Sequence, residues 1–152
     1  MLGVDFFLHA GLLAGMYQRA SPFLLPPVEA FRLIPVGYLA FLLLAVLLLW
    51  LMLRLEIRGA RAGFSFGLRL GLLAWGALTL GLASISTADL DLLVGWWIGQ
   101  SLELGIAGAL AGYGFSQARL LRLAAAVFGL VILLLVLTVM MQTFGLAPAA
   151  RI

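Results

Sequence analysis

Two charged side chains stand inside long apolar runs of the sequence, where an ionisable group is costly and is by default a candidate functional site. Arg69 lies in the run 63–85 and Glu103 lies in the run 90–115. If these runs form a hairpin that turns near Ala88, the two residues are offset along the helix axes by about four residues, or ~6 Å. An arginine side chain can bridge that offset, so we predict a buried Arg69–Glu103 ion pair.

Glu103 also has polar neighbours on its own run. Gln100 precedes it by one helical turn and Ser101 lies nearby, so the carboxylate is expected to belong to a small polar cluster. Three roles are open for the charged pair: an ion pair that fixes helix register, an arginine that extends alone toward the headgroups, or part of a transport or proton-relay pathway. A proton pathway usually contains several such groups, and these runs contain few.

His9 is the second candidate for chemistry and the chain's one histidine. Asp5 precedes it by four residues, which places both side chains on one face of a helix. An imidazole can bind a haem or bacteriochlorophyll axially, and Gly11 or Gly15 would leave room for the flat ring. The alternative is a histidine hydrogen-bonded to its neighbouring carboxylate. A single histidine and no cysteine exclude disulfides and cysteine-ligated or multi-histidine metal sites.

The elements that position these residues are membrane helices. Of the 152 residues, 65% are hydrophobic and 10% are charged, and the mean hydropathy is +1.22. A soluble domain is about half apolar and about a quarter charged, so a soluble fold is excluded. Because about 20 apolar residues cross the hydrocarbon core, we predict an all-α polytopic transmembrane helical bundle, a single membrane domain over 1–152, with spans at 35–53, 63–85, 90–115 and 123–144.

The N-terminal part leaves the number of spans at four or five. Residues 1–17 are barely long enough to cross a bilayer, and they form either a short first span or an interfacial or re-entrant helix. They are not expected to be a signal peptide, because Asp5 stands where a basic residue is needed. Residues 18–34 contain three prolines, at 22, 26 and 27, which prevent a continuous helix, and are predicted to lie at the membrane interface.

The charged connections indicate the orientation. Loops 54–61 and 116–122 contain arginines, whereas the connection between the runs 63–85 and 90–115 carries no basic residue, only Asp89 and Asp91. Because basic loops stay in the cytoplasm, we predict that both arginine loops face inward and the acidic turn faces outward. Lysine and asparagine are both absent, and the codons of both are rich in A. Their absence indicates a GC-rich, bacterial genome, so we predict a protein of the bacterial cytoplasmic membrane. The net charge of +3 comes from scattered arginines, so nucleic acid is not an expected partner.

The spacing of glycine predicts how the helices pack. Small residues four apart let two helix backbones approach closely in lipid, and we predict that 63–85 and 90–115 form a tight hairpin while 35–53 and 123–144 lie toward lipid. The pattern does not distinguish contacts within the chain from contacts with a partner. The glycines at this spacing are Gly11, Gly15, Gly63, Gly67, Gly71, Gly95, Gly99, Gly108 and Gly112.

The stretch 63–115 resembles the central half of small glycine-rich bacterial inner-membrane proteins of unassigned function. The shared features are a glycine-rich helix, an acidic outer turn and a second helix with a Trp–Gly–Glu–Gly pattern, here Trp97, Gly99, Glu103 and Gly108. The resemblance covers this stretch alone and implies no activity.

The inventory of side chains favours a non-enzymatic role. The sequence shows no nucleophile–base pair, no phosphate-binding glycine loop and no lysine. We therefore expect a packing or accessory subunit of a homo-oligomer or of a larger membrane complex, in contact with membrane lipids and other membrane subunits, and without a cofactor. The alternatives are a small transporter or channel that uses Arg69 and Glu103, and a subunit that holds a pigment or haem through His9.

Overall fold

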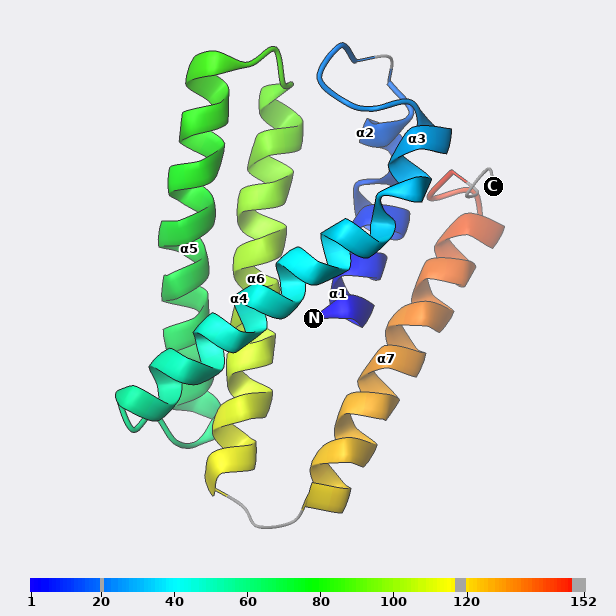
Figure 1. Ribbon diagram of the computed structural model, residues 1–152. Helices are drawn as coiled ribbons and strands as arrows, with labels where there is room; N and C mark the ends of the chain where they lie inside the picture. The colour runs from blue at the N-terminus through cyan, green and yellow to red at the C-terminus, as the bar shows by residue number, and fades with distance from the viewer. Residues whose placement is uncertain (20, 117–119, 149–152) are drawn as a thin grey trace.

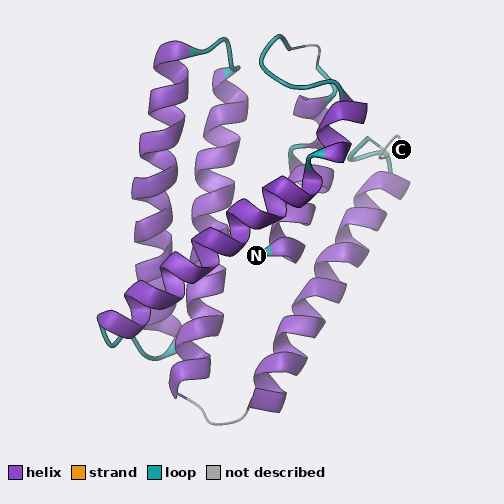
Figure 2. Cartoon of the chain, in the orientation of Figure 1, coloured by secondary structure: helices purple, strands orange, loops and turns teal. Residues whose placement is uncertain are grey.

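The chain folds into helices joined by short connections. The computed structural model describes residues 1–19, 21–116 and 120–148, and all regular structure within these ranges is helical, as Figure 2 shows. In Figure 1, α5 and α6 stand side by side, α4 crosses them obliquely, and α7 stands on the far side of the N-terminal helices. The prediction of an all-α protein is confirmed. The four long helices are α4 (Ile34–Arg54), α5 (Ala60–Ile85), α6 (Leu90–Ser116) and α7 (Leu120–Thr143).

Three of these helices, α4, α5 and α7, are long and apolar enough to cross a membrane. Helix α6 is as long as α5, but its middle carries the polar residues Gln100, Ser101 and Glu103, which lower its hydropathy. The length and apolar composition of these three helices are consistent with a membrane protein.

Helices α5 and α6 form the closest contact in the molecule. Gly63, Gly67 and Gly71 lie buried along the face of α5 that meets α6. A Cβ atom placed on Gly63 or Gly67 would approach the α6 backbone to well under 3.0 Å, closer than real Cβ atoms come. Only a residue without a side chain permits this approach, and in lipid such close backbone packing is a main source of helix association.

Helices α4 and α7 lie on the outside of the bundle. Of the 21 residues of α4, Leu48 and Met52 are buried, and they pack with Leu104 of α6. Helix α7 packs mainly against the N-terminal helices. Most of the exposed large side chains of both outer helices are leucine, valine and isoleucine, for which lipid tails are a suitable solvent.

The N-terminal segment fills the space between α6 and α7. Its side chains Leu8 and Leu13 fit against Gly99 and Gly95 of α6, respectively. Figure 1 shows that α1 begins at mid-height of the bundle and that the segment then rises toward the end where α5 joins α6. Its elements are α1 (Leu2–Phe7), the π-helical turn η1 (Leu8–Leu12) and α2 (Ala14–Tyr17), followed after the proline-containing connection by α3 (Pro27–Arg32).

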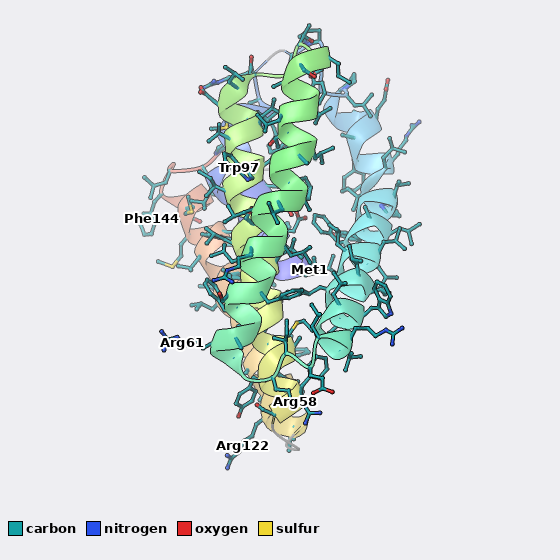
Figure 3. All side chains as sticks on the ribbon, turned by 90° about the vertical axis from the view of Figure 1, so that its left-hand side faces the viewer. Met1, Arg58, Arg61, Trp97, Arg122 and Phe144 are labelled. Carbon is teal, nitrogen blue, oxygen red and sulfur yellow. The ribbon has the colours of Figure 1, made fainter. Side chains whose placement is uncertain are left out.

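The basic and acidic connections lie at opposite ends of the bundle. Arg58 and Arg61 lie at the connection between α4 and α5, and Figure 3 shows them at the same end as Arg122. Asp89 precedes α6 in the connection at the other end, and Arg119 lies outside the described residues. The bundle thus has the charge asymmetry on which the positive-inside rule acts.

Candidate functional site

Polar side chains of the N-terminal segment and α6 meet in one hydrogen-bonded network. His9 Nε2 lies 3.0 Å from Asp5 Oδ1, and Gln100 Nε2 lies 3.3 Å from the same oxygen. On the other side of the imidazole, His9 Nδ1 bonds to the hydroxyl of Tyr17, which also accepts the indole N–H of Trp96. The network therefore runs in the order Trp96, Tyr17, His9, Asp5 and Gln100.

The π-helical turn η1 aligns the members of the network that come from the N-terminal segment. The Leu13 N–H donates to the Leu8 carbonyl, five residues back, at 2.7 Å. In a regular α-helix, residues eight apart point about 80° away from each other. The extra residue of a π-turn makes positions eight apart behave like positions seven apart, which share a face. His9 and Tyr17 are brought together in this way, and π-turns are frequent at functional sites.

The donors and acceptors of the network permit a continuous proton arrangement. The Trp96 indole can only donate, so the Tyr17 oxygen accepts from it, and the hydroxyl can direct its own proton to His9 Nδ1. Burial raises the pKa of Tyr17 above its ordinary value, so the phenol keeps this proton. In that arrangement the proton of His9 is on Nε2, which donates it to Asp5. Asp5 accepts from both His9 and Gln100.

Glu103 is the most deeply buried ionisable group of the site. Its side chain is wholly inaccessible, and neither carboxyl oxygen has a hydrogen-bond partner among the described residues. The amino group of Met1 lies 4.0 Å from its Oε1. Gln100 stands one helical turn away on α6, so Glu103 adjoins the network without being hydrogen-bonded to it. A buried group of this kind is costly, and intramembrane examples are by default functional candidates.

The structure does not bring Arg69 and Glu103 together, and the predicted ion pair is not formed. Arg69 is exposed on α5, whereas Glu103 lies toward the Met1 amino group of the N-terminal segment. The orientation of both helices is the reason. Arg69 lies two residues from both Gly67 and Gly71, so it points to the side of α5 opposite the face that meets α6. On α6, Leu104 and Gly105 meet the glycine face of α5, whereas Glu103 faces the N-terminal segment.

The other two members of the predicted polar cluster are separated from each other. Gln100 bonds to Asp5 and lies 3.2 Å from His9 Nε2. Ser101 is buried against Gly71 of α5 and donates its hydroxyl proton to a backbone carbonyl of its own helix. Gln100 therefore belongs to the site, whereas Ser101 belongs to the contact between α5 and α6.

The predicted glycine faces make two different contacts within the chain. The α5 series meets the α6 backbone, and Gly95 and Gly99 receive leucines of the N-terminal segment. Gly11 faces Met141 of α7 at ordinary contact distance, and Gly15 has nothing within 4 Å of a Cβ position. Helix α6 thus carries a glycine face on each of two sides. The glycines of the contact between α5 and α6 are Gly63, Gly67, Gly71, Gly105, Gly108 and Gly112.

His9 does not fit the role of an axial ligand. Its Nδ1 is bonded to Tyr17 and its Nε2 to Asp5, so both ring nitrogens are engaged. To bind the metal of a haem or bacteriochlorophyll, one nitrogen of His9 would have to be free of its hydrogen bond. The network residue beside that nitrogen would also have to move away. Among the described residues, no group of three or more His, Cys, Asp or Glu side chains is placed to hold a metal ion.

A half-open cleft of about 1050 Å³ lies beside the network. Asp5, His9 and Tyr17 contribute polar groups to its lining. The cleft extends to the first turns of α4, where Tyr38 and Phe41 form part of the wall. Apolar walls with a few converging polar groups are typical of small-molecule sites, and this volume is slightly above their usual range.

Three residues of the site were not predicted from the sequence. Tyr17 and Trp96 are network members, and Gln142 of α7 lines the cleft and donates to the Ala10 carbonyl at 3.0 Å. Tyr17 lies eight residues after His9, a spacing that indicates a shared face only if a π-turn is known to intervene. Trp96 and Gln142 are distant in sequence from their partners, and no local pattern identifies them.

Comparison of the chain with protein-family models, with curated proteins and with solved structures finds no match. Function is therefore inferred from the geometry of the network and the cleft.

Proposed function

We propose that this chain is a non-enzymatic integral membrane protein of the bacterial cytoplasmic membrane that binds a small amphipathic molecule in the cleft. The construction of the cleft supports this proposal. Most of its lining is apolar, and Asp5, His9 and Tyr17 place polar groups together at one side. A molecule with a polar head and an apolar body matches both kinds of surface, and such molecules are concentrated in the bilayer that would surround the cleft.

In the proposed arrangement, α4, α5, α6 and α7 cross the membrane and the N-terminal segment enters part-way. Helix α6 has 27 residues, a length of about 40 Å, which exceeds the ~30 Å of a hydrocarbon core. Its polar side chains Gln100, Ser101 and Glu103 are buried, so they do not meet lipid. The arginine loops 54–61 and 116–122 face the cytoplasm, and the cleft lies toward the outer surface.

A substitution that fills the cleft tests the proposal. Gly37 lines the cleft on α4, and nothing lies within 4 Å of the position its Cβ would take. We expect wild-type protein in lipid nanodiscs to carry a bound small molecule in native mass spectra, and Gly37→Phe to lose it because the ring occupies the site. Gly129→Phe is the matched control, since Gly129 on α7 is equally open and outside the lining. Identical adducts in wild type and Gly37→Phe would contradict the proposal.

A second role, as a subunit of a homo-oligomer or larger membrane complex, is favoured by the outer face of α4. Only Leu48 and Met52 of this helix are buried, so its exposed residues outside the cleft lining leave an apolar face for a membrane partner. The glycine faces of α5 and α6 are already occupied within the chain. The same mass spectra report the number of subunits, and a monomer with no co-purifying protein would remove this role.

A further inference from the structure

We infer that the molecule bound in the cleft is an organic cation, an amphipathic amine or quaternary onium ion with an apolar body, and that Asp5 is its counter-ion. This inference rests on the proposed function, because it names the chemistry of the occupant of the same cleft. Three features carry it: the charge left on Asp5, the pairing of the one arginine in the described lining, and the aromatic walls.

Asp5 accepts two hydrogen bonds in the network. Its Oδ1 accepts from His9 Nε2 at 3.0 Å and from Gln100 Nε2 at 3.3 Å, and both donors are neutral in the arrangement in which the Tyr17 hydroxyl donates to His9 Nδ1. Its side chain is only 14% exposed and lines the cleft. A carboxylate so far removed from water is stabilised when a cation is placed against it, and the cleft is the side from which a cation can approach.

Arg19 lines the cleft but does not neutralise Asp5. Its Nη1 lies 3.8 Å from Asp91 Oδ2, and the two side chains are 58% and 74% exposed. This pair therefore stands in contact with solvent, and its charges offset each other. With His9 neutral in the arrangement described above, Asp5 is the remaining charge among the described lining residues, and the side of the cleft that it lines is negative.

Aromatic side chains form part of the lining of the same cleft. Phe6 comes from α1, Tyr17 from α2, and Tyr38 and Phe41 from α4. The faces of aromatic rings attract cations, and quaternary ammonium groups are recognised in this way. A neutral ligand would leave the charge of Asp5 unmatched, and an anion would be repelled by it. A cation with an apolar body meets the carboxylate, the rings and the apolar wall together.

Tetraphenylphosphonium and tetraphenylborate test the sign of the charge, because they have nearly the same shape and opposite charges. Binding of each ion is measured by titration calorimetry with protein in nanodiscs, and the value for Gly37→Phe is subtracted to remove uptake by lipid. We expect wild type to bind the phosphonium at least about tenfold more tightly than the borate, as one partly buried charge contact allows. Asp5→Asn keeps an oxygen that accepts from His9 and Gln100, and should lose the preference. Asp5→Glu keeps the charge and should retain it.

The outcomes separate this inference from the proposed function. The assignment of a cation is overturned if tetraphenylborate binds in the cleft as tightly as the phosphonium or more tightly. It is also overturned if Asp5→Asn keeps the preference for the phosphonium. In both cases the cleft is still a binding site. Binding of neither ion above the Gly37→Phe level also overturns the assignment. The proposed function fails as well only when native mass spectra of the wild type show no adduct that Gly37→Phe removes.

Discussion

Glu103 occupies a position that few glutamates can tolerate: it is wholly buried in the middle of α6 and has no hydrogen-bond partner among the described residues. Replacing such a group by an apolar residue of similar volume is often neutral or stabilising. We expect Glu103→Met to unfold at a temperature equal to or above that of wild type. Glu103→Ala leaves a cavity and should lose about 2 kcal/mol or more. Circular dichroism during thermal unfolding in detergent measures both variants.

The control in that experiment is the comparison between the two variants, since both remove the carboxyl group and only one removes its volume. If Glu103→Met is as unstable as Glu103→Ala, the carboxyl makes a contact on which the fold depends. The amino group of Met1, 4.0 Å away, is the partner that such a result would identify.

At the scale of single residues, the sequence identified most of the polar groups of the site but few of their partners. The four-residue spacing of Asp5 and His9 correctly put them in contact. The partner of Glu103 could not be predicted from the offset along the helix axes, because successive residues of a helix point about 100° apart. Arg69 lies two residues from both Gly67 and Gly71 and therefore points away from the contact with α6. Tyr17 and Trp96 are 79 positions apart, and only the folded chain joins them.

At the scale of elements, α5 offers two glycines that test the close contact with α6. A Cβ at Gly67 would collide with the Leu104 carbonyl, whereas a Cβ at Gly81 on the same helix has nothing within 4 Å. We expect Gly67→Ala to destabilise the protein by about 1–3 kcal/mol through overpacking. Gly81→Ala should leave stability unchanged or raise it by up to about 1 kcal/mol, because alanine favours the helix. Equal effects of the two substitutions on thermal unfolding would contradict this account.

The spacing of the glycines shows what can be predicted about elements from sequence and what cannot. The series Gly63, Gly67 and Gly71 marks the face of α5 that approaches another backbone, because that approach requires the same small residue once per turn. The same spacing at Gly95 and Gly99 marks a different contact, in which leucines of the N-terminal segment fill the groove. Spacing therefore predicts that a groove exists, whereas its occupant depends on the path of the whole chain.

At the scale of the whole molecule, the long helices alternate in direction and bring the arginine connections to one end (Figures 1 and 3). Hydropathy alone identifies α4, α5 and α7 as long apolar helices. Helix α6 differs because its polar side chains Gln100, Ser101 and Glu103 are buried against the rest of the chain, and hydropathy cannot distinguish a buried polar group from one that faces lipid. Whether α6 crosses the bilayer is therefore a question of topology, which labelling can answer.

The chain has no cysteine, so single introduced cysteines report topology without a background signal. Ala60, Thr87 and Ser116 are exposed residues at successive ends of α5 and α6. Because basic loops are retained in the cytoplasm, we expect Thr87→Cys to react with a membrane-impermeant maleimide in cells whose outer membrane alone is permeabilised. Ala60→Cys and Ser116→Cys should react only after the inner membrane is opened.

The reverse pattern would invert the proposed orientation and place the cleft toward the cytoplasm. Labelling of Thr87→Cys and Ser116→Cys from the same side would show that α6 does not cross, and the four-span arrangement would then be wrong.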